Sequence, residues 1–372
     1  MDSILVLNYE FPPLGGGASP VSYEIAKRYV SKGYHVDVIT MGYKGLPEFE
    51  TIDGINVYRV KCLRKRKETC ETHEMISYVL SAALFMAKRL KEKQYDICHC
   101  HFLIPTGVVA FFLKKLYSLD YIVTIHGSDI PGYNSDRFIL EHYFTKPILR
   151  IIGKNAKVVC SPSLYLMQLA EQKIGNFNYM HVPNGIDLDE FKLDLSKPKE
   201  KIILSTGRLL ERKGFHTLIR AVKDIELPYE VHIAGDGPYR QQLESLAKHS
   251  KTKIVFHGWL EKGTSELKNL YEKASIYVLV SSKENASIAL LEGMAAKCVI
   301  ISSNVSGCPE TVGSAGFVID FDDDGKLKQI LIDLCSDPNK VDDYSNKAYN
   351  RLHSYFLWDK SMEKYITALN LR

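Results

Sequence analysis

SSKENASIALLEGMA, residues 281–295, follows the apolar run SIYVLV of residues 275–280. The apolar run is typical of a buried strand, and apolar residues recur at helical spacing from Ile288 to Ala296. The sequence therefore predicts a strand, a short loop and the start of a helix. This is the repeating unit of an α/β fold.

The start of this helix is a predicted phosphate site. Ser287 is a suitable N-cap residue, and the first helical amides, those of Ile288, Ala289 and Leu290, then have no partner within the helix. Free amides at a helix N-terminus bind anions because the helix dipole also favours negative charge there.

Two glutamates flank the same helix start. Glu292 lies about one turn inside the helix, and helical side chains lean toward the N-terminus, so its carboxylate is expected to reach the space that Glu284 enters from the loop. Carboxylates are good acceptors for sugar hydroxyls. The expected ligand therefore carries both phosphate and sugar. In the alternative interpretation, Glu284 caps the loop and Glu292 is a solvated helix residue.

Composition favours two ordinary globular domains. The 372 residues are 45% hydrophobic and 25% charged, which suits two cores. Lys and Arg number 48 against 44 Asp and Glu, too small an excess to indicate nucleic-acid binding. Eight cysteines without framework spacing favour a reducing, cytoplasmic setting. The first residues read as a strand without a signal peptide, and the longest uncharged apolar stretch, Met75–Ala87, falls short of the roughly 18 residues that span a bilayer.

Strand and helix patterns alternate along the whole chain, which predicts two doubly wound domains with parallel sheets. We expect residues 1–190 to form the first, acceptor-side domain, together with a last helix in 355–372 that crosses back to it. Residues 191–354 form the second, donor-binding domain, and Asp187–Lys201 is the expected linker. Ligands of such folds lie beyond the carboxyl ends of the strands, so the domains are expected to face a central cleft. The predicted strands span 4–7, 35–41, 95–100, 121–125, 156–160, 201–205, 230–234, 253–256, 275–280 and 298–302.

Several motifs occur in one order along the chain. They are the glycine-rich loop Gly15-Gly16-Gly17, the turn Pro183-Asn184-Gly185-Ile186-Asp187, Gly207-Arg208 followed by Lys213-Gly214, and the glutamates Glu284 and Glu292. Together they resemble the retaining GT-B glycosyltransferases of family 4, from the first strand to the last helix. A stretch including Asp136-Arg137-Phe138 is similar to bacterial envelope-polysaccharide members of that family, and the chain as a whole resembles bacterial or archaeal envelope-polysaccharide glycosyltransferases.

The resemblance implies roles for particular residues. Arg208 and Lys213 would bind the diphosphate, Arg by its fork and Lys as a point charge. His126 and Glu284 would position the transferred sugar, and Glu292 would hold the ribose. The loop at Gly16 and Gly17 would lie against the donor phosphate and the acceptor. Further nucleotide contacts are expected from Ser287, Ile288 and Ala289 at the helix start and from Trp259 and Leu260 at the base, with core packing as the alternative for Trp259.

Two stretches could be mistaken for metal sites. In Cys98-His99-Cys100-His101 the strand period points the cysteines to one face and the histidines to the other, so the four cannot converge on zinc. The acidic run Asp320–Asp324 precedes Gly325 and is interpreted as a solvated turn. We expect no metal and no cofactor, because the nucleoside-diphosphate sugar is a co-substrate, with a UDP-sugar favoured over a GDP-sugar.

One departure from the family pattern concerns the end of the central helix. Lys297 stands where the family usually has Gly, which would supply a positive φ. We therefore expect a strained or differently closed turn at Lys297.

The predicted activity is transfer of a sugar to an acceptor hydroxyl, on a lipid-linked or cell-envelope glycan. The alternatives are a nucleotide-sugar epimerase of the same fold and a non-catalytic nucleotide-sugar-binding protein. A basic cluster at Lys61–Lys67 precedes the predicted helix at Met75–Ala87, and it is expected to contact the inner face of the cell membrane. In the alternative interpretation it is a solvated loop beside a core helix.

Overall fold

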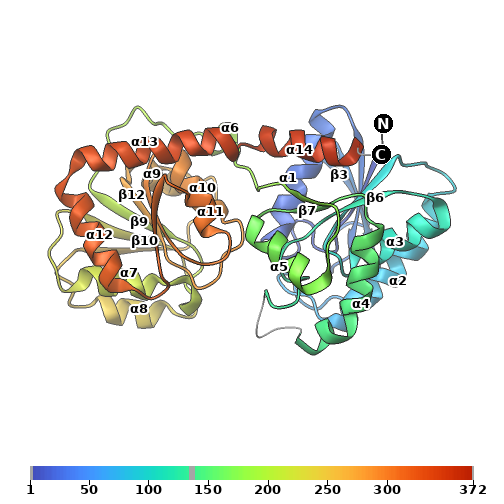
Figure 1. Ribbon diagram of the computed structural model, residues 1–372, viewed down its shortest axis with the longest axis horizontal. Helices are drawn as coiled ribbons and strands as arrows, with labels where there is room; N and C mark the ends of the chain where they lie inside the picture. Colours follow the sequence, from blue (N-terminus) through green and yellow to red (C-terminus); the bar gives the residue numbers. More distant parts are fainter. Residues whose placement is uncertain (1–2, 134–138, 371–372) are drawn as a thin grey trace. The chain divides into compact units, whose positions relative to one another are not determined.

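The computed structural model describes residues 3–133 and 139–370. The chain divides into two compact units, each built around its own sheet (Figure 1). The first unit comprises Met1–Val182 and Met362–Arg372, and the second comprises Pro183–Ser361. Asp136-Arg137-Phe138 lies outside the described residues.

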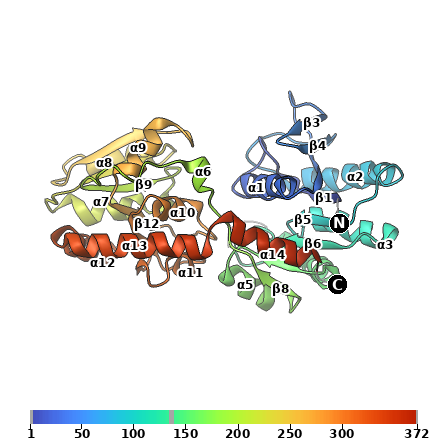
Figure 2. The ribbon, with the colours of Figure 1, turned by 90° about the horizontal axis from the view of Figure 1, so that it is seen from above.

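Within the described residues, the first unit contains an eight-stranded sheet of order β3-β4-β2-β1-β5-β6-β7-β8. Its neighbouring strands are parallel except for β3 and β4, which form an antiparallel hairpin at the edge (Figure 2). The hairpin was not predicted, because β3 is mostly exposed and lacks an apolar run. The strands are β1 Ser3–Leu7, β2 His35–Met41, β3 Phe49–Ile52, β4 Ile55–Val60, β5 Ile97–His101, β6 Tyr121–Thr124, β7 Val159–Ser161 and β8 Tyr179–His181.

Helices cover both faces of this sheet, as in other doubly wound folds. One face carries an apolar core to which α2, α3, α4 and α5 contribute side chains. Tyr29 of α1 and Tyr365 of α14 contact His99, which lies on the other face. The helices are α1 Ala18–Ser31, α2 Thr72–Arg89, α3 Thr106–Tyr117, α4 Ile139–Asn155, α5 Leu164–Ile174 and α14 Trp358–Asn370.

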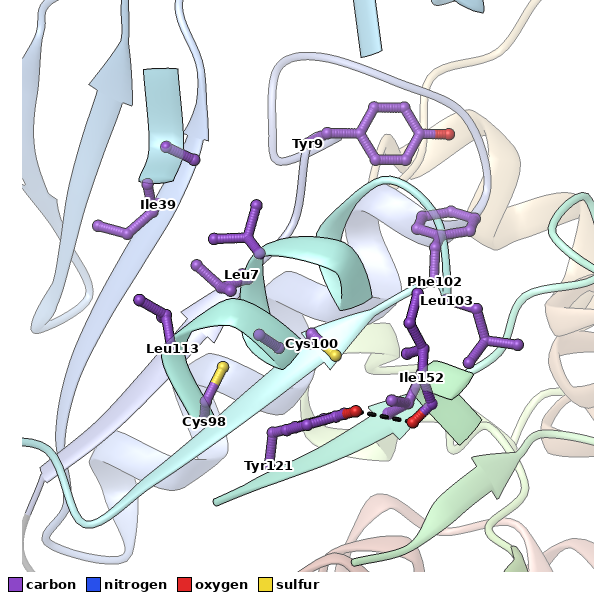
Figure 3. Packing of buried hydrophobic residues seen from close by; sticks show 14 of the residues in the cluster. Leu7, Tyr9, Ile39, Cys98, Cys100, Phe102, Leu103, Leu113, Tyr121 and Ile152 are labelled. Carbon is purple, nitrogen blue, oxygen red and sulfur yellow. Dashed lines mark hydrogen bonds between the residues drawn. The ribbon is translucent and has the colours of Figure 1, made fainter. Parts of the chain in front are cut away.

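Strand β5 shows how alternation distributes side chains between the two faces. Cys98 and Cys100 lie in the apolar core with Leu7, as Figure 3 shows. In that core the Tyr121 hydroxyl donates to the carbonyl of Ile152 over 2.7 Å, so its buried polar atom is satisfied. The rings of His99 and His101 stack on each other instead, with centroids 4.5 Å apart. The prediction that the cysteines and histidines point to opposite faces is confirmed.

The second unit contains a six-stranded parallel sheet of order β11-β10-β9-β12-β13-β14 in the described residues. Its strands are β9 Ile202–Thr206, β10 Glu230–Ala234, β11 Ile254–Gly258, β12 Ile276–Leu279, β13 Val299–Ser303 and β14 Gly316–Ile319. Its helices are α6 Leu188–Phe191, the 3-10 helix Glu211–Lys213, α7 Phe215–Lys223, α8 Arg240–Ala247, α9 Ser265–Lys273, α10 Ile288–Ala295, α11 Cys308–Val312, α12 Asp324–Ser336 and α13 Pro338–Tyr355.

Two apolar cores lie on opposite faces of this sheet because successive strand residues point to opposite sides. Ile202 and Leu204 pack in the core of α9, α10 and α13. Ile203 packs in the other core, formed with α7, α8 and α12. Figure 1 shows α7 and α8 on one side of the sheet and α9 and α10 on the other. The predicted GT-B architecture of two parallel Rossmann-like sheets is confirmed.

The chain first passes from the first unit to the second between Val182 and Pro183, earlier than the expected boundary at residue 190. The expected linker belongs to the second unit because its side chains are anchored there. Phe191 is buried in that unit's core, and the Asp194 amide donates to the Glu272 carboxylate over 2.9 Å. The polar composition of this segment gave no sign of these contacts. Gly185 does not adopt a positive φ; instead, a Cβ there would lie 2.6 Å from the backbone of Trp358.

The expected strain at the end of α10 is present. Lys297 has φ 51°, in the left-handed region that glycine favours. Its ammonium lies 4.9 Å from the ring centroid of Tyr349, a favourable cation–π contact. Lys297 therefore closes the helix in the conformation that a glycine would have supplied.

Candidate functional site

The diphosphate ligands predicted in the second unit follow the carboxyl end of β9. Gly207 and Arg208 come directly after the strand, and the Arg208 side chain is exposed. Lys213 ends the 3-10 helix, and Gly214 then adopts φ 71°. A Cβ on Gly214 would lie 2.0 Å from the Val280 carbonyl oxygen. Only glycine fits there, so Gly214 lets this loop pack directly against the end of the β12 segment.

Lys213 is ion-paired with Glu284, 71 residues further along the chain. The two side chains are 21% and 13% exposed, so the pair is mostly shielded from water. The buried Ser281 also donates a hydrogen bond to the Glu284 carboxylate over 3.1 Å. Sequence reasoning assigned Lys213 and Glu284 to different parts of the ligand and did not predict their contact. Each charge therefore neutralises the other.

Glu292 has its own set of partners. The Tyr271 hydroxyl donates to its carboxylate over 2.9 Å, and the Lys262 ammonium lies 3.4 Å away. Tyr271 is fully buried, and desolvation with the nearby Glu292 carboxylate raises its pKa well above its usual range. The Glu292 side chain is only 13% exposed, so the alternative of a solvated helix residue is wrong. Glu284 and Glu292 share no partner among these contacts.

Helix α10 begins where the sequence predicts. Ser287 is the N-cap residue with extended backbone angles, but its side chain makes no capping hydrogen bond. Ile288 and Ala289 follow it and are half-buried. The first-turn amides thus keep the geometry of an anion site without competition from a serine hydroxyl.

The two residues expected at the base differ in exposure. Trp259 is 62% exposed, which rules out the alternative that it packs in the core. Leu260 is half-buried against the core of α9 and α10. Both follow β11, whose last residue, Gly258, accepts a hydrogen bond from Gly235 over 2.7 Å. An exposed indole beside an anchored leucine is compatible with a surface on which a planar base stacks.

The glycine-rich loop of the first unit is fixed by a hydrogen bond to Glu10. The Gly16 amide donates to the Glu10 carboxylate over 3.2 Å, and Gly15 has φ 97°. A Cβ on Gly16 or Gly17 would meet no atom within 4 Å. The loop therefore leaves open space at the two glycines predicted to approach the ligand, while Gly15 makes the turn.

His126 lies just beyond β6 and is half-buried. Its Nε2 is 3.0 Å from Nδ1 of His101, so one nitrogen donates and the other accepts. Burial lowers the pKa of His126 to about 3, and burial also lowers that of His101 well below its usual range. Both rings are therefore neutral near pH 7. The buried Asp129 accepts hydrogen bonds from the His126 and Gly127 amides, each over 3.1 Å, and fixes this turn.

Residues 320–323 after β14 are exposed and form a turn, as predicted, and Asp322 also has protein partners. Asp322 accepts hydrogen bonds from Thr217 over 2.9 Å and pairs with Arg220. Within residues 3–133 and 139–370, no group of three or more His, Cys, Asp or Glu side chains is arranged to hold a metal ion. Asp322 therefore ties its loop to α7.

Sequence reasoning missed several partners of the site. These are Ser281, Tyr271, Lys262, His101 and Asp129. Tyr271 and Lys262 meet Glu292 through the tertiary fold, and no spacing in the sequence reveals them. Ser281 lies only three residues before Glu284, so its contact is local. His101 and Asp129 did carry a signal, because His101 ends a strand beside the strand that leads to His126, and Asp129 stands three residues after His126.

Two Rossmann-like sheets, with glycine loops and charged residues after the strands, define the GT-B architecture. The comparisons with known proteins agree. Residues 15–190 match the family described as "Glycosyltransferase Family 4" and residues 188–351 that described as "Glycosyl transferases group 1". An uncharacterised glycosyltransferase of Methanocaldococcus jannaschii is 32% identical over 83% of this chain and 82% of its own. The chain therefore belongs to these nucleotide-sugar-dependent glycosyltransferases, which decides against the epimerase and the non-catalytic binder.

Two further proteins are similar. One is the GDP-mannose-dependent monoacylated α-(1-6)-phosphatidylinositol monomannoside mannosyltransferase of Corynebacterium glutamicum, 26% identical over 68% of this chain and 70% of that protein. The other is the Anabaena protein HepE, whose structure in complex with UDP has a TM-score of 0.77, 16% identity and coverage of 99% of both chains.

Proposed function

We propose that the enzyme transfers a sugar from a nucleoside-diphosphate sugar to an acceptor hydroxyl with retention of the anomeric configuration. The observation that carries this proposal is the shielded Lys213–Glu284 pair, which joins a cation to an acid beside the start of α10. A diphosphate needs the cation, and sugar hydroxyls need the acid.

In this proposal different residues of the second unit bind the diphosphate, the ribose and the base of the donor. Arg208, Lys213 and the amides of Ile288 and Ala289 stabilise the charge that develops on the leaving diphosphate. The ribose hydroxyls bind to Glu292, and the base stacks at Trp259 and Leu260. From the first unit, Gly16 and Gly17 lie against the phosphate and acceptor, and His126 accepts or donates a hydrogen bond at the transferred sugar.

The Lys213–Glu284 pair couples binding of the diphosphate to binding of the sugar. The Lys213 ammonium neutralises Glu284. A bound diphosphate competes for that ammonium, and sharing it lets the Glu284 carboxylate accept hydrogen bonds from the sugar. The pair then becomes a bridge between phosphate and sugar, so donor binding prepares the acid that positions the reacting part of the molecule.

We propose a UDP-sugar in preference to a GDP-sugar. HepE, solved with UDP, supports this choice, whereas the Corynebacterium relative is GDP-mannose-dependent. Thermal-shift titration with UDP-, GDP- and ADP-sugars tests the donor, and NMR of the product's anomeric proton tests retention. A product of inverted configuration, or nucleotide binding without turnover over a broad acceptor panel, would overturn the proposal.

The acceptor is proposed to be a lipid-linked or cell-envelope glycan reached at the inner face of the membrane. In the described part of the chain, no helix is long and apolar enough to cross a bilayer. Lys65, Arg66 and Lys67 are exposed, as a peripheral contact requires. Arg64 is not available, because its guanidinium donates to the carbonyls of Tyr9, Arg66 and Lys67.

Helix α2 supplies an apolar counterpart to these cations. Ile76, Leu80 and Leu84 recur at every fourth residue and are 58%, 62% and 69% exposed. An apolar stripe beside basic residues suits the interface of an anionic bilayer, where each basic residue contributes about 1 kcal/mol. Flotation with anionic liposomes tests this contact. Equal flotation of the wild type and a Lys65, Arg66, Lys67→Ala variant would contradict it.

A further inference from the structure

A pocket of about 250 Å³ opens in the first unit, beyond the carboxyl ends of β2 and β4. These strands are neighbours and run parallel, with Met41 opposite Val60. Ligands of doubly wound folds collect at this edge of the sheet. The pocket lining comprises Gly42, Tyr43, Lys44, Leu46, Glu48, Arg59, Lys61, Cys62 and Arg64.

The lining is strongly basic. It contains four cations, Lys44, Arg59, Lys61 and Arg64, and a single acid, Glu48. Glu48 pairs with Lys61 over 3.0 Å, and Arg59 pairs with Glu50 over 2.5 Å. The charges of Lys44 and Arg64 have no such carboxylate within the described residues, so the pocket keeps a positive field.

Arg59 supplies a second, independent observation. Its side chain is only 1% exposed, and its Nε is buried without a hydrogen-bond partner. A buried donor without a partner is costly, and most such groups in native proteins are satisfied. An acceptor atom from a bound ligand would supply the hydrogen-bond partner that the Arg59 Nε lacks.

The pocket is also continuous with the glycine-rich loop. Arg59 donates to the carbonyl of Pro12 over 3.4 Å, and Arg64 donates to that of Tyr9 over 3.1 Å. The Gly15 amide donates to the Lys67 carbonyl over 2.7 Å. A ligand in the pocket therefore lies against the segment that leads into Gly16 and Gly17.

We propose that this pocket binds an anionic group, a carboxylate or a phosphate, carried by the acceptor. The inference rests on the proposed function, since it names the chemistry of the molecule that receives the sugar. A neutral glycan would leave Lys44 and Arg64 without a counter-charge, whereas an anion can accept from several basic side chains of the lining at once. The anion can belong to a soluble acceptor or to a lipid headgroup, and both present the same oxygen atoms.

Binding is measured on the full chain with UDP at saturation, or with GDP if that is the nucleotide that binds, so that Arg208 and Lys213 are occupied. The probes are inorganic phosphate, glycerol 3-phosphate for a soluble anion, and phosphatidylcholine vesicles with or without phosphatidic acid for a headgroup. We expect phosphate to bind and glycerol alone not to bind. Stronger binding of glycerol 3-phosphate than of the phosphatidic acid vesicles assigns a soluble acceptor, and the reverse assigns a lipid.

The variants are Lys44→Ala with Lys61→Ala, because Arg59 and Arg64 hold backbone and their loss can unfold the loop. The double variant should weaken phosphate binding about tenfold, since charge-assisted hydrogen bonds are lost. Lys44→Arg should restore most of the affinity lost in Lys44→Ala, and Glu48→Gln should strengthen binding. Lys32→Ala, an exposed lysine at the end of α1, is the matched control.

The outcomes separate the two proposals. Equal phosphate affinity in the double variant and in Lys32→Ala, or no binding of any anionic probe by the wild type, overturns the pocket. Failure of every nucleotide to bind instead counts against the proposed function. Nucleotide binding that persists unchanged in the double variant, with weakened phosphate binding, supports the pocket as a separate site.

Discussion

In the first unit, His126 stacks beside His101, and burial keeps both rings uncharged. In the second unit, Glu284 and Glu292 are paired with Lys213 and Lys262. At His126 the first unit thus offers neutral donors and acceptors of fixed direction, whereas the second offers opposed charges at its glutamates that a ligand can rearrange. Neutral groups suit a sugar, and a movable cation suits a diphosphate whose charge grows during transfer.

Loss of the Lys213 ammonium should have the largest effect. Lys213→Ala removes a cation from the leaving group and leaves Glu284 unpaired in a shielded site, so we expect kcat/KM to fall on the order of 10²- to 10³-fold. Steady-state kinetics with the preferred donor measure this. Arg212→Ala is the control, since that exposed side chain lies next to Lys213; a similar loss in both variants would remove the special role of Lys213.

The two glutamates should differ in kind. Glu284→Gln should mainly lower kcat, because an interaction with the reacting sugar and with Lys213 is lost. Glu292→Gln should mainly raise the donor KM, because ribose is bound alike throughout the reaction. Each effect is expected to be roughly tenfold to a hundredfold. If both variants kept the wild-type kcat and donor KM, the pair would be structural.

Acid should weaken the first unit through its histidines. Burial lowers the pKa of His99 and of His126 to about 3. Below the ordinary histidine pKa of about 6.5, the unfolded chain therefore binds protons at these residues that the folded unit does not bind. The stability they contribute is complete above about pH 6.5 and is lost as pH falls toward 3, roughly 1–2 kcal/mol for each histidine at pH 5.

Thermal unfolding between pH 7 and pH 4.5 measures this loss. His126→Gln should flatten the pH dependence of unfolding, because one of these protons is no longer gained. His249→Gln, an exposed histidine of the second unit, should leave it unchanged. An unaltered slope in His126→Gln would mean that this ring is charged in the folded protein or already free in water.

Chelation should have the smallest effect. Arg208, Lys213 and the start of α10 are proposed to supply the positive charge that a metal ion provides in other transferases. Activity in excess EDTA should therefore match the activity in Mg²⁺ within about twofold. Activity lost in EDTA and recovered with Mg²⁺ would contradict the proposed diphosphate ligands.

Local patterns in the sequence predicted most elements of the fold. Apolar runs located most of the strands, and the helical spacing after Ser287 located α10. The strain at Lys297 could be predicted because one position of a known helix end lacked its glycine. By contrast, the β3–β4 hairpin was missed although Asp53-Gly54 is a typical two-residue hairpin turn with both φ angles positive, because β3 itself has no buried residue. The polar composition of the linker likewise gave no sign that Phe191 is buried.

The choice of candidate residues and their contacts depend on different information. Residue type, position and the resemblance to the family singled out Arg208, Lys213, His126 and the two glutamates as candidates. The pairing of Lys213 with Glu284 joins loops 71 residues apart, and that of Tyr271 with Glu292 joins α9 to α10. Such pairs depend on how helices pack over a sheet, which short-range spacing does not encode.

The return of the last residues to the first unit has a consequence for how the protein is made. Tyr365 of α14 packs against His99, with ring centroids 5.3 Å apart, and Lys364 donates to the His181 carbonyl over 3.0 Å. A ribosome therefore synthesises all of the second unit before it supplies the final piece of the first. The domain begun first is completed last, so the second unit can finish folding while the first still waits for its closing helix.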